Sequence, residues 1–322
     1  MKKIIVSVSI TFIFFMMTSF VIATERSELS GKLLVFHAGS LAVPFKQIRD
    51  EFKKQHPNVD VELEAAGSRI CARKISELHR RCDVMASADY SVIDKLLIPE
   101  FAEWNIKFAA NEMAIVYTDK SRRANEITVD NWYDILLDKK VVIGRSEPNV
   151  DPCGYRAVLT IKLAELYSQK KGLAKALIAK DHRYIRPKET DLLALLEMGS
   201  IDYIFLYRSV ARQHGLKFLR LPDQINLKST EYEDIYAKSS VKISGKTPGT
   251  FINKIGAPMV YGLTIPKNAP NPVAALAFVD FLLDSNQGMK IIEKCGQPTV
   301  IPTKSERYNY IPERLKKYAL PL

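Results

Sequence analysis

Apolar residues in the first third of the chain follow two alternating periods. Short apolar runs typical of strands, such as Lys32–Phe36 and Val59–Glu64, are each followed by a segment with helical spacing. In the first such segment, Leu41–Gln55, apolar residues return every three or four positions, which predicts an amphipathic helix. The same order repeats at Asp83–Ala86 and Ser91–Ile98. This alternation predicts an α/β fold with parallel strands and helical crossovers.

Two further apolar strands, Met113–Thr118 and Met259–Ile265, divide this pattern into parts. The residues between them carry a strand and helix pattern of their own. We therefore expect two α/β lobes joined by a double hinge, with lobe 1 built from both ends of the chain. The expected boundaries are residues 28–117 and 262–322 for lobe 1 and residues 118–261 for lobe 2. Ligands of such sheets bind beyond the carboxyl ends of the strands, which would face a cleft between the lobes.

The N-terminus has the pattern of an export signal. Two lysines in Met1–Lys3 precede the uncharged apolar run Ile4–Ile22, and cleavage is expected after Ala23, so that residues 1–23 form a signal peptide. An uncleaved N-terminal anchor is the alternative, because the run is nearly long enough to span a bilayer. In both cases we expect the mature protein in the periplasm or on the outer face of the cytoplasmic membrane.

The composition adds a basic charge and four cysteines. The formal net charge is +11, and removal of Lys2 and Lys3 with the signal would lower it by two. This charge either attracts an anion or reflects a solvated lysine-rich surface. Its even distribution and the absence of a binding motif argue against nucleic acid. The cysteines match no zinc spacing, and an exported chain permits disulfides or free thiols, so their pairing stays open. They are Cys71, Cys82, Cys153 and Cys295.

The triplet Ala-Gly-Ser occurs twice, each time after a strand-like run and before a helical pattern. Glycine permits a tight turn, and the first N–H groups of a helix are free to bind an anion. Serine at such a position also caps helices, which is the alternative explanation. Because both turns follow successive strands, we predict that they point at one bound anion from the same edge of the sheet. The candidate contacts are Gly39, Ser40 and Ser68.

The expected second lobe offers further candidates. Asp151, followed by Pro152 and Cys153, is placed to cap a helix, and Glu189 lies near the start of another. Tyr207 ends a short apolar strand, where its hydroxyl could donate into the cleft or simply pack. A carboxylate repels an anion unless another group binds it, so Asp151 needs a separate explanation.

Catalysis has little support in the sequence. The five histidines show no metal-ligand spacing, and no nucleophile elbow, P-loop or dinucleotide fingerprint occurs. We therefore expect no enzyme activity and no cofactor. One alternative stays open, an exported hydrolase in which His37 would activate Ser40.

Seven segments, in this order, resemble the tungstate/molybdate-binding proteins of ABC transporters, and specifically the archaeal type. They are VFHAGSL, EAAGSRICARKI, DVMASADY, NEMAIVYTDKS, DPCGYR, RPKETDLLALLEMGSIDYIF and YGLTIPKNAPN. The resemblance covers roughly Leu33 to Pro302. It implies a type II periplasmic-binding-protein fold, no catalysis, and a monomeric receptor that hands the oxyanion to a membrane permease.

The resemblance also implies which residues hold the oxyanion. Two carboxylates, here Asp151 and Glu189, would ligate the tungsten or molybdenum itself and raise it from four to six coordination, as suits hard oxygen donors. That role would explain Asp151. Because lobe 2 looks short between Tyr167 and Tyr184, the match at Glu189 rests on the segment RPKE, and Asp191 is the fallback. The implied contacts are Gly39, Ser40, Ser68, Asp151, Pro152, Cys153, Glu189 and Tyr207.

The resemblance leaves two choices open. Tungstate and molybdate are nearly equal in size, so the sequence does not rank one above the other. A receptor for another tetrahedral anion, sulfate or phosphate, stays as the alternative within the same fold.

Overall fold

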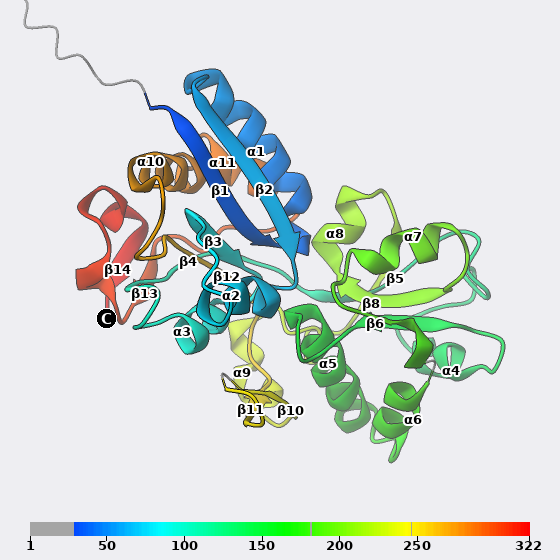
Figure 1. The fold of residues 1–322 in the computed structure, drawn as a ribbon. Helices are drawn as coiled ribbons and strands as arrows, with labels where there is room; N and C mark the ends of the chain where they lie inside the picture. The colour runs from blue at the N-terminus through cyan, green and yellow to red at the C-terminus, as the bar shows by residue number, and fades with distance from the viewer. Residues whose placement is uncertain (1–28, 181, 246) are drawn as a thin grey trace, which may run out of the picture.

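The computed structural model describes residues 29–180, 182–245 and 247–322. The predicted signal peptide, residues 1–23, lies outside the described residues. Two five-stranded sheets, each with helices packed against it, form two lobes (Figure 1). The predicted α/β class is confirmed. Of the helices in the described part of the chain, none is both long and apolar enough to cross a bilayer.

The sheet of lobe 1 has the strand order β2-β1-β3-β12-β4. Strand β1 is parallel to β2 and β3, whereas β12 is antiparallel to β3 and β4. The strand bounds are Gly31–Ala38 (β1), Val59–Ala66 (β2), Val84–Ser87 (β3), Ile106–Ala110 (β4) and Val260–Thr264 (β12). The helices of lobe 1 are Gly39–Leu41 (η1), Ala42–Gln55 (α1), Ser68–Ser76 (α2), Tyr90–Leu96 (α3), Pro272–Leu283 (α10) and Gly288–Lys294 (α11). Strand β12 thus returns between β3 and β4 after the chain has built lobe 2.

The sheet of lobe 2 has the order β7-β6-β8-β5-β9. Its strands are Met113–Tyr117 (β5), Ile143–Ser146 (β6), Ile185–Arg186 (β7), Tyr203–Tyr207 (β8) and Lys217–Arg220 (β9). Its helices are Trp132–Leu137 (α4), Pro152–Ser168 (α5), Leu173–Ala179 (α6), His182–Tyr184 (η2), Asp191–Glu197 (α7) and Arg208–Gln213 (α8). Because β5 pairs with β8 and β9, the chain enters this sheet before Met113, a few residues earlier than the boundary drawn at residue 117.

Smaller elements complete the fold. The antiparallel hairpin of β10 (Ser240–Ser244) and β11 (Phe251–Ile255) lies beside α5, below α2 and α3 in Figure 1. It was not predicted from the sequence. The other elements are Thr230–Tyr232 (η3), Glu233–Tyr236 (α9), Thr303–Ser305 (β13), Tyr308–Tyr310 (η4), Glu313–Tyr318 (η5) and Ala319–Pro321 (β14).

The apolar face predicted for the first helix forms part of the core of lobe 1. Phe45, Ile48 and Phe52 are fully buried in α1. The ring of Phe52 lies 5.2 Å from Phe278 and 5.5 Å from Phe281 of α10, both in edge-on contact. This packing fixes α1 against α10, and with it the turn before α1 that carries the first candidate residues.

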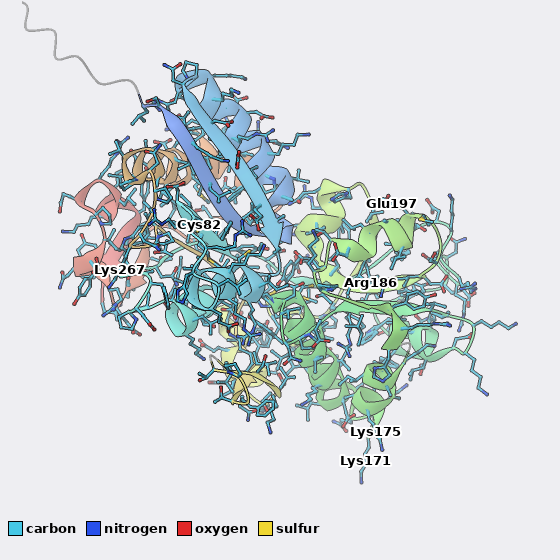
Figure 2. The ribbon with its side chains drawn as sticks, in the orientation of Figure 1. Cys82, Lys171, Lys175, Arg186, Glu197 and Lys267 are labelled. Carbon is cyan, nitrogen blue, oxygen red and sulfur yellow. The ribbon has the colours of Figure 1, made fainter. Side chains whose placement is uncertain are left out.

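Exposed lysines contribute to the surface charge, whereas the cysteines are buried. Lys171 and Lys175, near the start of α6, extend away from the body of lobe 2 into solvent (Figure 2). All four cysteines are buried free thiols. Burial raises the pKa of Cys71 to about 12, so this thiol stays neutral and unreactive.

Candidate ligand site between the lobes

The two Ala-Gly-Ser turns lie side by side at one edge of the first sheet. Ala38 and Ala66, the last residues of β1 and β2, are paired in the parallel register, so both turns leave the sheet at its carboxyl edge. Both serines are fully buried, and neither caps its helix through its side chain. The prediction that the turns share an edge is therefore confirmed, and the capping explanation fails for these serines.

Each serine hydroxyl is held so that its own hydrogen remains available. The Oγ of Ser40 accepts a hydrogen bond from the hydroxyl of Tyr261 at 3.0 Å. The Oγ of Ser68 accepts one from the backbone N–H of Ala88 at 2.9 Å. A hydroxyl that accepts in this way can still donate its hydrogen to a ligand. Lobe 1 thus presents two oriented donors next to two helix starts.

In lobe 2, the carboxylate of Asp151 joins two loops. Its Oδ1 accepts a hydrogen bond from the N–H of Cys153 at 3.2 Å, so that it caps α5 as predicted, with Pro152 in the first turn. Its Oδ2 accepts a hydrogen bond from the N–H of Glu189 at 2.9 Å. Capping uses only one of the two oxygens, and the other fixes the loop that carries Glu189.

The carboxyl group of Glu189 points from lobe 2 toward lobe 1. A methyl group placed on Gly39 would lie 3.0 Å and 3.1 Å from its two oxygens. Neither oxygen accepts a hydrogen bond of normal geometry from the residues that the structure describes, although the side chain is only 1% exposed. Asp191, the fallback carboxylate, is instead half-buried and pairs with Lys188 at 3.5 Å. The structure therefore brings Glu189, and not Asp191, to the turn at Gly39.

The two buried carboxyl groups have unusual protonation. Burial, together with the charge of the nearby Asp151, raises the pKa of Glu189 well above its usual range. Burial also raises the pKa of Asp151. A buried carboxylate without a partner is costly, because the charge has lost its water and gained nothing in return. The pair is thus completed either by a proton or by a positively charged centre.

The remaining predicted residues lie in the same region. Tyr207 ends β8, and its hydroxyl accepts a hydrogen bond from Nη1 of Arg156 at 3.0 Å, which leaves the phenolic hydrogen free to donate. The thiol of Cys153 points toward the carbonyl oxygen of Phe205 at 3.7 Å. The thiol of Cys153 is thus directed into lobe 2, and its N–H already donates to Oδ1 of Asp151.

Three residues near the site were missed by the sequence analysis. Arg156 and Tyr261 orient the hydroxyls of Tyr207 and Ser40. Ser146 ends β6, and its buried hydroxyl lies beside Asp151 and Cys153 without a hydrogen bond of normal geometry to a described residue. Arg156 was visible inside the segment DPCGYR, and Ser146 follows the rule that ligands bind at the carboxyl ends of strands. Tyr261 could not have been predicted as a site residue, because its local sequence pattern is that of an ordinary strand.

The hydrolase alternative lacks its essential contact. The Nδ1 of His37 is hydrogen-bonded to the carbonyl oxygen of Ala38 at 2.8 Å, and the imidazole packs against Phe45. Burial lowers the pKa of His37 to about 4. Among the described residues, the hydrogen bond at Oγ of Ser40 comes from Tyr261 and not from His37. This arrangement fits a structural histidine better than a general base.

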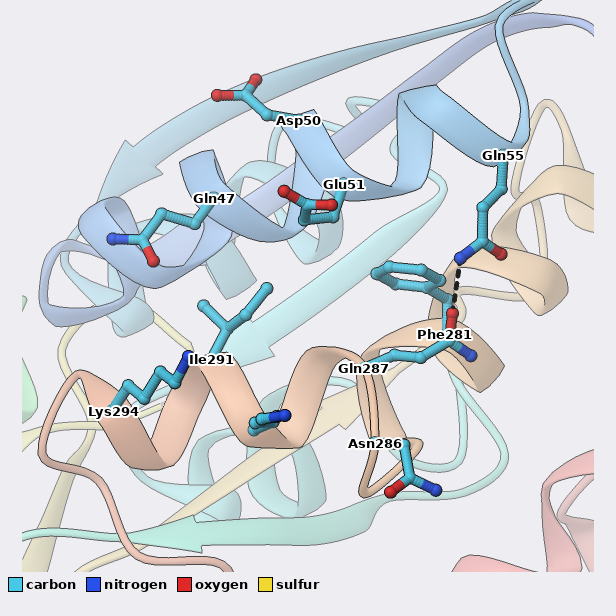
Figure 3. Close-up of a pocket in the computed structure, with 10 residues that line it drawn as sticks. Gln47, Asp50, Glu51, Gln55, Phe281, Asn286, Gln287, Ile291 and Lys294 are labelled. Carbon is cyan, nitrogen blue, oxygen red and sulfur yellow. Dashed lines mark hydrogen bonds between the residues drawn. The ribbon is translucent and has the colours of Figure 1, made fainter.

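A surface hollow lies apart from these residues. It has a volume of about 500 Å³ and opens between α1 and α11 (Figure 3). Its walls are mostly polar, and Nε2 of Gln55 donates a hydrogen bond to Oε1 of Gln287 across it at 2.7 Å. None of the eight predicted contacts lines this hollow. It is no part of the candidate site.

Comparison with known proteins defines the class of the chain. The family model for bacterial extracellular solute-binding proteins matches residues 33–296. The periplasmic molybdate-binding protein of Azotobacter vinelandii has the same fold, with a TM-score of 0.60 at 19% identity, over 84% of this chain and 99% of that one. The sulfate-binding protein SubI of Mycobacterium tuberculosis superimposes with a TM-score of 0.59 at 12% identity, over 90% and 92% of the two chains. The chain therefore has the type II periplasmic-binding-protein fold and belongs to the extracellular solute-binding protein family.

Two relatives are closer in sequence. An uncharacterised solute-binding protein of Petrotoga mobilis is 50% identical over 307 residues, which cover 94% of this chain and 95% of the relative. The molybdate/tungstate-binding protein WtpA of Pyrococcus abyssi is 41% identical over 320 residues, which cover 91% of each chain. The resemblance found in the sequence is confirmed, and the family is one of receptors and not of enzymes.

The raised pKa of Glu189 predicts a pH dependence of the ligand-free protein. With the lobes closed, both carboxyl groups have pKa values above their usual range, so the closed form binds more protons than an open form in which water reaches them. By linkage, closure is favoured below the usual pKa of these groups and weakens as the pH rises through the raised value. X-ray scattering should give a larger radius of gyration near pH ~7 than near pH ~4. A radius that does not change between these conditions would contradict the prediction, and Glu189→Gln should reduce the change.

Proposed function

We propose that this chain captures tungstate or molybdate between its two lobes and delivers the oxyanion to the membrane permease of an ABC transporter. The observation that carries the proposal is the carboxyl group of Glu189. Both of its oxygens are buried, neither makes a hydrogen bond of normal geometry to a described residue, and they lie against the turn at Gly39. A tetrahedral oxyanion with a large metal centre would use these oxygens as additional ligands of the metal.

The neighbouring groups suit the oxygen atoms of the same ligand. The hydroxyls of Ser40, Ser68 and Tyr207 each have a free hydrogen, and the starts of η1 and α2 add backbone N–H groups. A hydrogen bond to a charged ligand contributes roughly 1.5–3 kcal/mol. Donors would thus bind the outer oxygens while Asp151 and Glu189 approach the metal at the centre. Hard oxygen donors are the ligands that such a metal prefers.

Relatives give independent support. The Pyrococcus abyssi relative and a relative from Thermococcus kodakarensis, 39% identical over 320 residues, are both molybdate/tungstate-binding proteins WtpA. The likeness to the sulfate-binding fold does not favour sulfate, because at 12% identity it concerns the fold alone. Two carboxyl groups facing the ligand would repel sulfate, whose small central atom accepts no further oxygen ligands.

Isothermal titration calorimetry with four anions tests the proposal. We expect tight binding of tungstate and molybdate, and weak or undetectable binding of sulfate and phosphate. Only a metal centre can accept the two carboxylates as additional ligands. Binding of neither metal oxyanion would refute the proposal. Equal affinity for sulfate and tungstate would support a general receptor for tetrahedral anions instead.

A further inference from the structure

A second cluster of buried charged groups lies between the lobes, next to the proposed ligand site. Asp89, which follows β3 in lobe 1, is 3% exposed. Its Oδ2 accepts hydrogen bonds from the hydroxyl of Tyr155 in α5 and from the ammonium group of Lys254 in β11. Although burial acts in the opposite direction, Lys254 and Arg156 hold the pKa of Asp89 well below its usual range. One ionised carboxylate thus joins lobe 1, lobe 2 and the β10–β11 hairpin.

The hairpin is also bonded to lobe 1 at both of its ends. Near the end of β11, Nζ of Lys254 donates to Oγ of Ser91 at 2.5 Å. At the other end, Nη2 of Arg73 in α2 donates to the carbonyl oxygen of Gly245 at 2.9 Å and to Oγ of Ser244 at 3.2 Å. Arg69 of α2 donates to the carbonyl oxygen of Ser244.

Lobe 2 holds the same hairpin by separate contacts. Nζ of Lys162 in α5 donates to the carbonyl oxygen of Ser240 at 2.5 Å. The N–H of Ser244 donates to Oδ1 of Asn149 at 2.9 Å, in the loop that leads to Asp151. A single hairpin therefore crosses the line where the lobes meet and is tied to both.

The two faces of the hairpin differ in a way that allows a controlled test. Lys254 pairs with Val241 on the inner face, together with the pair Ile243 and Ile252. Lys242 lies on the outer, solvent-facing side, with its Nζ 4.3 Å from the ring centre of Phe251. The two lysines occupy adjacent registers of one hairpin but face in opposite directions.

This cluster is connected directly to the proposed ligand contacts. Arg156, the neighbour of Tyr155, donates from Nη1 to the carbonyl oxygen of Ala88 at 2.6 Å and to the hydroxyl of Tyr207 at 3.0 Å. The N–H of the same Ala88 donates to Oγ of Ser68. Contacts that hold α5 against Ala88 and Asp89 thus also hold Tyr207 opposite Ser68.

We propose that the β10–β11 hairpin is a strap that holds the closed lobes together, with Lys254 as a positioning residue that slows release of the bound ligand. The proposal rests on the proposed function for the identity of that ligand. Opening the lobes would take Tyr155 and Arg156 away from Asp89 and Ala88, whereas encounter with the ligand precedes these contacts. The strap should therefore act on the dissociation rate and not on the association rate.

Stopped-flow kinetics with tungstate test the strap in wild type, Lys254→Met, Lys254→Arg and Lys242→Met. Lys254→Met should raise the dissociation rate roughly 10- to 100-fold with little change in association, because truncating one partner of a buried pair acts on release. Lys254→Arg keeps the charge and should recover part of the slow release. Lys242→Met, on the outer face, should dissociate tungstate at the wild-type rate.

A second variant tests the strap independently, in case Lys254→Met fails to fold. Arg73→Gln removes the contact at the other end of the hairpin and leaves Asp89 untouched, and it should also speed release. If a purely structural role held, the melting temperature would fall equally with and without tungstate, and the release rate would not change. Wild-type release rates in both Lys254→Met and Arg73→Gln would overturn the strap.

The strap and the proposed function fail in distinguishable ways. If wild type binds neither tungstate nor molybdate, the proposed function fails. The strap is then judged from X-ray scattering of the ligand-free protein near pH ~4, where closure is favoured. There wild type should be more compact than Lys254→Met, and Lys242→Met should match wild type. Equal radii of gyration for wild type and Lys254→Met would overturn it.

Discussion

Glu189→Gln should weaken tungstate and molybdate binding roughly 100-fold, while the ligand-free protein keeps or gains stability. Loss of one charged contact with a ligand costs up to about 3 kcal/mol, which is a factor of roughly 100. The carboxyl group of Glu189 makes no hydrogen bond of normal geometry to another described residue, although it lies close to the N–H of Ser40 and to Asp151, so the fold should lose little with it. An amide also avoids burying a negative charge. Function and stability should therefore move in opposite directions.

Asp151→Asn gives a complementary result. Asparagine caps helices as well as aspartate, so α5 should persist. The amide nitrogen cannot accept the hydrogen bond that Oδ2 receives from the N–H of Glu189, which should lower stability by about 1 kcal/mol. Binding of the metal oxyanions should fall as in Glu189→Gln, because the second carboxylate ligand has gone.

The ratio of tungstate to sulfate affinity distinguishes ligation of the metal by the two carboxylates from hydrogen bonding by the helix starts alone. If the carboxylates ligate the metal, the ratio should collapse in both variants, since sulfate loses only a repelling charge. Asp191→Asn is the matched control, because that carboxylate is half-buried and pairs with Lys188. It should keep the wild-type ratio. An unchanged ratio in Glu189→Gln and Asp151→Asn would leave only hydrogen bonding from the helix starts.

The sheets of this protein could be predicted because their signals are local. Parallel strands buried by helices need short apolar runs, and the two Ala-Gly-Ser turns mark where β1 and β2 end, at the paired residues Ala38 and Ala66. The β10–β11 hairpin has no such signal. Its outer face exposes Phe251 and Ile255, and its inner face carries Lys254, whose partners come from other parts of the chain. Its position depends on contacts that no local pattern encodes.

In the ligand site, too, some residues could be predicted from local sequence patterns, whereas others depend on contacts with distant parts of the chain. The donors at Gly39 and Ser68 follow from the rule for strand ends, and the capping role of Asp151 follows from the Asp-Pro pair. Glu189 was expected near a helix start, and it lies two residues before α7, but its carboxyl group turns toward Gly39. Only the closed arrangement of the lobes gives it that partner. Without the resemblance to a known family, its sequence position would have indicated a favourable dipole contact and nothing more.

Gly67→Ala should abolish tight tungstate binding without harming the fold. Gly67 precedes α2 with φ −57° and ψ 137°, a conformation open to any residue. Its methyl group would lie 2.5 Å from the carbonyl oxygen of Val150 and 3.2 Å from Cβ of Asp151, both in lobe 2. The first contact is with backbone, so it can be relieved only if the lobes stay apart. Receptors of this class bind by hinge closure around the ligand, and a blocked closure loses the contacts from Asp151 and Glu189 together.

We expect a loss of roughly 100-fold or more in tungstate affinity, from at least two charged contacts at about 1.5–3 kcal/mol each. The ligand-free protein should gain about 0.4–1 kcal/mol, because alanine restricts the unfolded chain. Gly39→Ala is the graded comparison, since its methyl group would meet side-chain oxygens of Glu189 at 3.0 Å and 3.1 Å that can move aside, so its effect should be smaller. Calorimetry and thermal unfolding on both variants give the two quantities. Wild-type affinity in Gly67→Ala would mean that binding does not require this contact between the lobes.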